Sequence, residues 1–173
     1  ADPASGTVCG ATNNPDYMVF ADKVGLGDLD INTTYDTLYT INLNTLELVV
    51  VPIDGYSING TINSYPLPSP AGAHTCSGDE IRPFGLKYHK GKVYVGAVCT
   101  AETTQNRANL WAYVFEYVEG TGFSATPVID FSLDFDREDS HFENSSGILV
   151  QTNWLPWKTI WNGASPIPDS LYK

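Results

Sequence analysis

The chain has 173 residues, 20 of them acidic and 9 basic, and its formal net charge is −11. This length fits one sizeable domain, and the charge excludes a nucleic-acid or anionic-lipid partner held by counterion release. No apolar run approaches the roughly eighteen residues of a membrane helix, so we expect no membrane insertion. The 42% hydrophobic content excludes a disordered chain.

The composition favours strands over helices. The 15 Gly and 11 Pro residues fall throughout the chain, and no stretch combines Ala, Leu, Glu and Lys at helical spacing. Aromatic residues, Thr and Val, which suit a pleated and half-buried surface, are plentiful instead. The predicted fold class is therefore all-β.

The first unit, residues 24–53, contains three predicted strands: 25–31, 36–43 and 46–53. In the first of these strands, Asp28 and Asp30 alternate with Leu29 and Ile31, which lie on the opposite face. We expect the two carboxylates to accept backbone N–H groups near a propeller axis or to contribute to a cation site there.

The second unit, residues 82–133, contains four predicted strands: 83–88, 92–99, 110–117 and 127–133. Cys76 and Cys99 flank the hairpin formed by the first two of these strands, which turns at Lys90–Gly91. This placement predicts a disulfide between the two cysteines, with two buried free thiols as the alternative. Cys9 is then left without a partner in the chain.

The two units share a layout. In each, a strand with glycine leads through a short turn into a strand that contains Leu-Tyr or Val-Tyr, and a longer apolar strand follows. Such a repeat is typical of propeller blades, whose inner strands crowd the axis where glycine fits. The prediction is a partial β-propeller of about two to three blades within residues 1–173, with a β-sandwich as the alternative. Because a propeller needs at least four blades, we expect other chains or fragments to complete it.

An acidic segment follows the second unit and is the candidate metal site. Asp134, Asp136 and Glu138 alternate and Asp139 follows, so an extended chain places carboxylates together as a hard cation such as Ca²⁺ requires. The competing interpretation is a solvated acidic loop, partly neutralised by Arg137. No other cofactor is predicted, because the Cys and His residues lack the spacing of a zinc site.

Residues 147–161 begin as a predicted strand and continue into an aromatic loop, placed at 153–168. Its three indoles, Trp154, Trp157 and Trp161, recur every three or four residues, but intervening prolines exclude a regular helix. We expect these side chains to pack onto the sheet, with a sugar-stacking platform as the alternative.

Three Asn-x-Ser/Thr sequences make Asn32, Asn59 and Asn144 candidates for N-glycosylation, and chance occurrence is the alternative. The first residues lack a signal-peptide pattern, so we expect either a mature chain or a piece of a longer one. Glu102 lies at a predicted strand end, where propeller enzymes often place polar groups, and it is a candidate catalytic acid. No pair among the 20 acids is selected as a glycosidase pair, and nucleophile-elbow and P-loop motifs are absent.

Four segments resemble a family of large bacterial surface proteins: residues 24–31, 38–43, 82–88 and 91–102. These proteins occur in Bacteroidetes and related marine bacteria, and a propeller-like N-terminal region precedes their adhesin-type repeats. The likeness extends over residues 17–161 and departs in the long loop 54–75. It implies a cell-surface location and adhesion, and it brings no catalytic residues with it.

The predicted function is non-enzymatic recognition or adhesion by an extracellular module of a bacterial surface protein, with a glycan or a protein as the ligand. The first alternative is a secreted propeller enzyme, a hydrolase or lyase that acts on polysaccharide. The second is a structural cap on a repetitive stalk. Convergent carboxylates in one cleft would favour the enzyme, and exposed aromatic residues on loops without such acids would favour binding.

Overall fold

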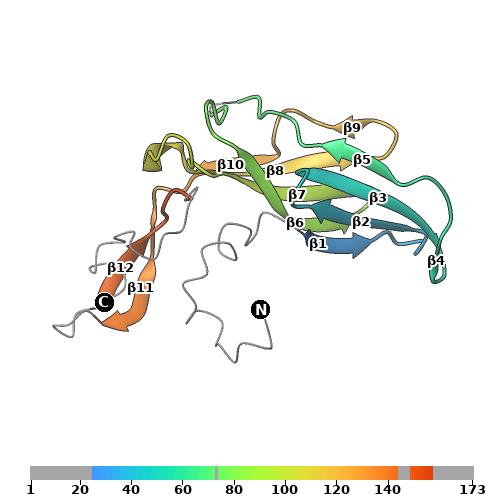
Figure 1. Cartoon of the computed structure of the whole chain (residues 1–173), viewed down its shortest axis with the longest axis horizontal. Coiled ribbons are helices and arrows are strands. Elements are labelled where there is room, and N and C mark those ends of the chain that lie inside the picture. Colours follow the sequence, from blue (N-terminus) through green and yellow to red (C-terminus); the bar gives the residue numbers. More distant parts are fainter. Residues whose placement is uncertain (1–24, 73, 144–148, 158–173) are drawn as a thin grey trace, which may run out of the picture.

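The computed structural model describes residues 25–72, 74–143 and 149–157 (Figure 1). Residues 136–143 and 149–152 are described by their backbone alone. The described residues form strands and one short 3₁₀-helix, Arg107–Asn109. The predicted all-β class is confirmed.

Most of the strands belong to two antiparallel sheets. The first sheet contains β1 (Leu26–Ile31), β2 (Thr37–Asn42), β3 (Glu47–Asp54), β4 (Ser57–Ile58) and β5 (Asn63–Pro66). The second sheet contains β6 (Ile81–His89), β7 (Lys92–Cys99), β8 (Trp111–Val118), β9 (Gly122–Phe123) and β10 (Ile129–Ser132). A separate hairpin pairs β11 (Asp136–Glu143) with β12 (Leu149–Asn153).

Each sheet is a meander. Strands β1, β2, β3 and β5 lie side by side in chain order, and so do β6, β7, β8 and β10. The two-residue strand β4 pairs with the end of β3, and the two-residue strand β9 pairs with the end of β8. Figure 1 shows the two sheets beside each other, with the β11–β12 hairpin projecting from one end.

Every predicted strand of the two units overlaps an observed one, but the interpretation of residues 54–75 as a loop was wrong. The segment contains β5, which pairs with β3 in a register that places Tyr65 opposite Leu48. Its sequence, Asn-Ser-Tyr-Pro, has no apolar alternation. Pairing with β3 therefore produces a strand that local propensity does not indicate.

The core lies between the two sheets. Alternate residues of β7 and β8 are buried, as expected for strands with one face covered. One apolar cluster joins both sheets through buried side chains: Tyr39, Ile41, Leu43, Leu48, Val50, Leu86, Val93, Val95 and Tyr117. Because residues of both sheets contribute to one cluster, the sheets pack face to face.

A disulfide joins Cys76 to Cys99, as predicted, with a Cα–Cα distance of 5.6 Å. Both cysteines are buried, and they pack with Ala97, Tyr113 and Phe115. Cys9 lies outside the described residues. Among the described residues, no helix has the length and apolarity to span a bilayer.

Candidate functional site

Two carboxylates of β1 connect the edge strands of the two sheets. Asp28 accepts the N–H of Leu86 at 3.1 Å, and Asp30 accepts the N–H of Tyr88 at 2.8 Å. Each carboxylate also accepts the N–H of the residue that follows it in β1, at 2.9 Å. Edge strands otherwise present unpaired N–H groups, so this carboxylate bridge satisfies both edges. The expectation that the two acids accept backbone N–H groups is confirmed.

Asp30 has a second kind of partner. Burial raises the pKa of Asp30, but hydrogen bonds from Lys87, Tyr88 and Ile31 outweigh burial and hold the pKa below its ordinary value. Its ion pair with Lys87 measures 2.8 Å, yet the lysine side chain is 74% exposed. Such an exposed pair contributes little to stability, so the backbone hydrogen bonds are the important contacts.

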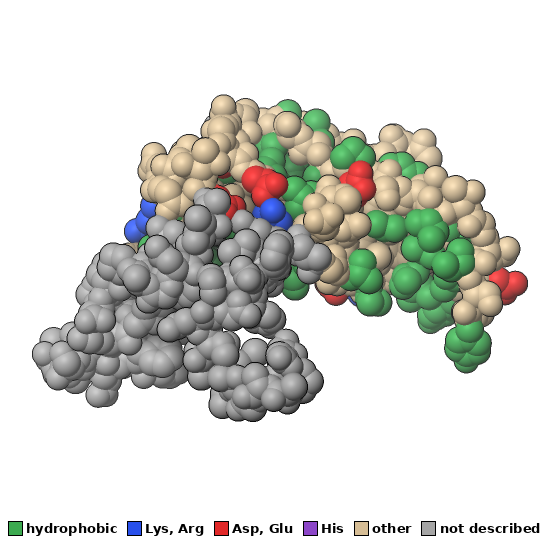
Figure 2. Space-filling view, in the orientation of Figure 1, with side chains coloured by type: hydrophobic (Ala, Val, Ile, Leu, Met, Phe, Trp, Pro, Cys, Tyr) green, Lys and Arg blue, Asp and Glu red, His purple; other side chains and the backbone are tan. Residues whose placement is uncertain are grey.

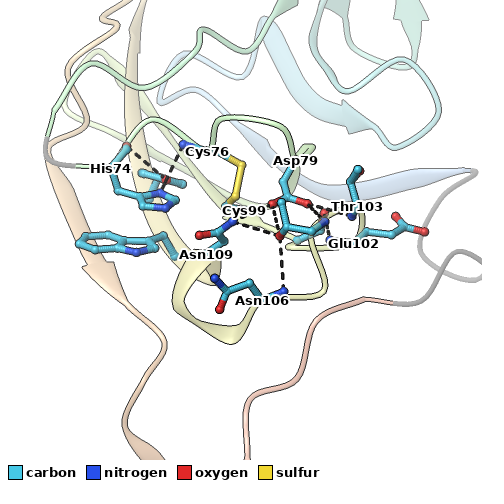
Figure 3. The surroundings of a disulfide bond; sticks show 12 residues. His74, Cys76, Asp79, Cys99, Glu102, Thr103, Asn106 and Asn109 are labelled. Carbon is cyan, nitrogen blue, oxygen red and sulfur yellow. Dashed lines mark hydrogen bonds between the residues drawn. A yellow bond between two sulfur atoms is a disulfide. The ribbon is translucent and has the colours of Figure 1, made fainter.

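The disulfide holds two loops together at the end of the second sheet where β7 ends and β8 begins. We call this region, loops 74–80 and 100–110, the disulfide end (Figure 3). The second loop contains the 3₁₀-helix, whose N-cap Asn106 accepts the N–H of Ala108 through its side chain. The cross-link and the cap fix the two loops in one arrangement.

Asp79 connects the two loops by hydrogen bonds (Figure 3). One carboxylate oxygen accepts the N–H groups of Thr103 and Thr104, and the other accepts the Thr104 hydroxyl and the Asn109 amide. Burial raises the pKa of Asp79, but these hydrogen bonds outweigh burial and lower it below the ordinary value. The carboxylate is therefore ionised at neutral pH and organises the loops.

His74 lies on the other side of the disulfide. Its ring stacks on the indole of Trp111 with centroids 4.8 Å apart, and its Nδ1 lies 2.8 Å from the hydroxyl oxygen of Tyr113. Burial lowers the pKa of His74 against the opposing charge of Asp79. The imidazole is therefore neutral at physiological pH.

A groove of about 340 Å³ opens beside the disulfide, and we call it the end groove. Three segments far apart in sequence line it: the turn at Thr45 and Leu46, residues 66–69 at the end of β5 and just after it, and residues 75, 76 and 79–81. Its lining combines apolar residues, among them Leu46 and Leu67, with the acidic residues Asp79 and Glu80. Its volume falls at the lower limit of small-ligand sites.

The end of the described chain returns to the disulfide end. The N–H of Trp157 donates to the carbonyl of Thr100 at 3.0 Å, and the Trp157 carbonyl accepts from Gln105 at 2.7 Å. The guanidinium of Arg82 lies 5.8 Å from the centre of the Trp157 ring. Trp154 packs edge-on against Phe135. These two tryptophans pack onto the protein, as expected, and Trp161 lies outside the described residues.

The predicted calcium ligands are described only in part. Asp134 is exposed, and its carboxylate accepts the hydroxyl of Ser132 at 2.7 Å. The side chains of Asp136, Glu138 and Asp139 lie outside the described residues. Within the described part, no group of three or more acidic, His or Cys side chains converges as a metal site would require, so calcium binding stays a prediction.

The remaining sequence candidates lie on separate loops. Asn32 is half-buried, and its side chain bonds to Asp36 and Thr37 in the β1–β2 turn. Asn59, after β4, is exposed, and Asn144 lies outside the described residues. Glu102 belongs to the disulfide end, where its N–H donates to the hydroxyl of Thr100. Glycosylation at these asparagines stays a prediction.

No local pattern in the sequence predicts the Asp79 network or the end groove. Asp79 follows Ser-Gly in the sequence and resembles an ordinary turn residue. A signal was present in the second loop, where short polar side chains, which often bond to the backbone, occur at Thr103, Thr104 and Asn109. This composition could have indicated a structured loop.

Two curated proteins of Dictyostelium discoideum are similar to most of the chain. Colossin-A is 26% identical over 151 residues, which is 86% of this chain and 1% of Colossin-A. Colossin-D is 27% identical over 144 residues, which is 83% of this chain and 14% of Colossin-D. The chain thus spans a small part of each of these relatives. No protein-family model matches the chain, and no solved structure matches it. The resemblance to bacterial surface proteins stays a prediction.

Proposed function

We propose that the chain is a recognition module of an extracellular protein, that its two sheets are consecutive blades of a β-propeller, and that it binds its ligand in the end groove. The observation that carries the proposal is the disulfide end itself. Cys76–Cys99 and the Asp79 network fix two loops beside a groove to which both sheets contribute. Loops held on a rigid scaffold are the usual location of binding sites.

The topology of the sheets supports the blade arrangement. A propeller blade is a four-stranded antiparallel meander, whereas immunoglobulin-like sandwiches connect their strands in Greek-key order. Both sheets here are meanders. Their first strands, β1 and β6, lie against each other through the carboxylate bridge, as the innermost strands of adjacent blades do.

The disulfide supports an extracellular location. Such bonds persist in oxidising compartments and are rare in the cytosol. Cys76 and Cys99 are both less than 5% exposed, so the bond belongs to the core rather than to a reactive surface pair. The sequence resemblance to bacterial surface proteins favours a more specific version of this proposal, in which the chain belongs to an adhesin at the cell surface.

Both carboxylates of the end groove are engaged within the chain, which favours recognition over catalysis. Asp79 accepts hydrogen bonds from the other loop, and Glu80 pairs with Arg82 at 2.7 Å. A glycosidase needs one acid that holds a proton and one that attacks or activates water. The lowered pKa of Asp79 makes it a poor proton donor at neutral pH.

The test is a binding measurement with a groove-filling variant. The wild-type chain is screened against a panel of neutral and charged glycans and extracellular proteins, and the best ligand is titrated. We expect Ser69→Trp, in the groove wall, to weaken binding by about tenfold or more, because the indole occupies the ligand's space. The matched control is Ser57→Trp, an exposed serine in β4, which leaves affinity unchanged.

Two results would contradict the proposal. The first is the absence of binding to every member of the panel. The second is an equal loss of affinity in both serine variants, because this would place the binding site away from the end groove.

A further inference from the structure

The segment that follows β3 has the features of a modification site. Residues 54–64 are all exposed, and Asn59, Gly60 and Thr61 form an acceptor sequence for N-glycosylation within them. The N–H of Asn59 donates to the carbonyl of Pro52 at 2.9 Å, which ties this segment to β3. Within the described residues, no hydrogen bond engages the Asn59 side chain. The backbone of Asn59 is therefore held in place while its amide nitrogen is accessible.

Asn32 belongs to the same kind of acceptor sequence but has the opposite environment. It is half-buried, and three hydrogen bonds hold its side-chain amide in the β1–β2 turn. Its Oδ1 accepts the N–H groups of Asp36 at 3.1 Å and Thr37 at 3.2 Å, and its Nδ2 donates to the Asp36 carboxylate at 2.6 Å. A glycan attaches to Nδ2, so modification of Asn32 would require this amide to leave its partners in the turn.

We infer that Asn59 carries an N-linked glycan and that Asn32 does not. The donor is an oligosaccharide esterified to a lipid phosphate. A bond forms between Nδ2 of Asn59 and the anomeric carbon of the sugar, and the bond from that carbon to the phosphate oxygen breaks. Nδ2 releases a proton, and the lipid phosphate departs with the electron pair. This transfer belongs to secreted proteins, so the inference rests on the extracellular location proposed above.

The neighbours of Asn59 indicate what the glycan does. Three apolar side chains of the same segment are exposed: Tyr56 fully, Ile58 at 60% and Ile62 at 48%. Figure 1 places β4 at one extremity of the molecule, and Figure 2 shows hydrophobic side chains gathered in that region. Exposed apolar clusters favour association with other molecules. A bulky and hydrophilic glycan attached among these side chains covers them.

The position of Asn59 leaves the end groove open. Asn59 bonds to Pro52 near one end of β3, whereas Leu46, which lines the end groove, precedes the other end. Six residue steps separate Leu46 from Pro52 along the chain, a distance of about 20 Å in a strand. A glycan on Asn59 therefore lies at the opposite end of β3 from the proposed ligand.

Site-resolved mass spectrometry tests the inference. The wild-type chain is secreted from eukaryotic cells, and a peptide N-glycosidase removes the glycans in heavy-oxygen water, which converts each glycosylated asparagine into a labelled aspartate. Chymotryptic cleavage after Tyr35 and Tyr56 separates Asn32 from Asn59. We expect the label at Asn59 and an unmodified asparagine at Asn32.

Two matched variants give a second readout. Thr61→Ala and Thr34→Ala each remove the hydroxyl of one acceptor sequence and keep its asparagine. Both are made in an Asn144→Gln background, so that the third acceptor sequence does not contribute. Thr61→Ala should lose one glycan on electrophoresis, and Thr34→Ala should migrate like the background chain. The Thr61→Ala chain should also bind more of a hydrophobic dye, because its apolar side chains lose their cover. Circular dichroism checks that both variants remain folded.

Three outcomes would overturn the inference. An unmodified Asn59 or a label at Asn32 would reject the choice of site, and unchanged dye binding by Thr61→Ala would reject the covering role. A secreted chain with an unmodified Asn59 that still binds its ligand in the end groove would leave the proposed function intact. A glycosylated Asn59 in a chain that binds no ligand would do the reverse.

Discussion

The first strands of the two sheets, β1 and β6, occupy the same place in their sheets but have different surroundings. Gly27 of β1 is packed against β6, whereas Gly85 of β6 faces open space. Asp28 and Asp30 of β1 provide acceptors, and the N–H groups of Leu86 and Tyr88 in β6 donate to them.

A repeated strand layout therefore does not require repeated contacts. β1 supplies the carboxylates and β6 supplies the N–H groups, so the two strands are complementary rather than equivalent. Such complementarity fixes the order of the sheets, because two copies of β6 could not form the same bridge.

Removal of the disulfide should produce the largest change. In the Cys76→Ser/Cys99→Ser double variant, the free energy of unfolding should fall by about 3 kcal/mol, because the unfolded chain gains the freedom of the opened loop. Urea denaturation measures the loss. Hydrogen exchange should increase first at the disulfide end, since the bond attaches to the second sheet. Cys9→Ser is the control and should leave stability unchanged. If hydrogen exchange increased in the first sheet before it increased at the disulfide end, the account would be contradicted.

Substitution by alanine should destabilise the fold at Gly27 and leave stability almost unchanged at Gly85. Gly27→Ala should destabilise the fold by about 1–3 kcal/mol, because the added methyl group meets backbone and buried side chains. Gly85→Ala has open space and should change stability by less than about 0.5 kcal/mol. Thermal unfolding of both variants measures the difference. Equal losses would show that β1 and β6 have equivalent surroundings.

The all-β class and the disulfide could be predicted from sequence because each depends on local patterns. The alternation in β7 and β8 gives strand faces directly, and the hairpin between them places Cys99 near the chain that precedes it. β5 could not be predicted, because Asn-Ser-Tyr-Pro becomes a strand only through pairing with β3. The choice between a propeller and a sandwich depends on how the sheets are arranged relative to one another and to further sheets. The periodicity of the strands does not encode that arrangement.

The candidate site was harder to predict than the fold. Asp28 and Asp30 were recognised as acceptors of backbone N–H groups, but their donors lie 58 positions away in sequence. The donors of Asp79 lie 24 or more positions away. The end groove needs three separate segments. Contacts of this kind arise from tertiary packing, and no local spacing reports them.

Acid should weaken the carboxylate bridge. The pKa of Asp30 is lowered in the folded chain, so its contribution to stability is present above the unfolded pKa near 4 and is lost as pH falls through the folded pKa. Asp30→Asn should lower stability at pH 7 by about 1 kcal/mol and flatten the acid side of the pH–stability curve. Urea denaturation between pH 7 and pH 2 measures both effects. Unchanged steepness in the variant would contradict the bridge.

The smallest effect is expected at His74. Burial lowers its pKa in the folded chain, so the stability it contributes is present above the unfolded pKa near 6.5 and declines as pH falls below that value. Titration of the imidazole by NMR should give a pKa below 6.5. His74→Phe should keep the stacking on Trp111 and remove the decline. A raised pKa would show that Asp79, rather than burial, dominates at the disulfide end.

The complementarity of β1 and β6 is tested most directly by hydrogen exchange at the N–H groups of Leu86 and Tyr88. In an exposed edge strand these amides would exchange rapidly. If the carboxylates of Asp28 and Asp30 hold them, as described, both amides should be protected at pH 7. An Asp28→Ala/Asp30→Ala double variant, which removes both acceptors, should lose that protection while β7 keeps its own. Rapid exchange of both amides in the wild-type chain would contradict the account.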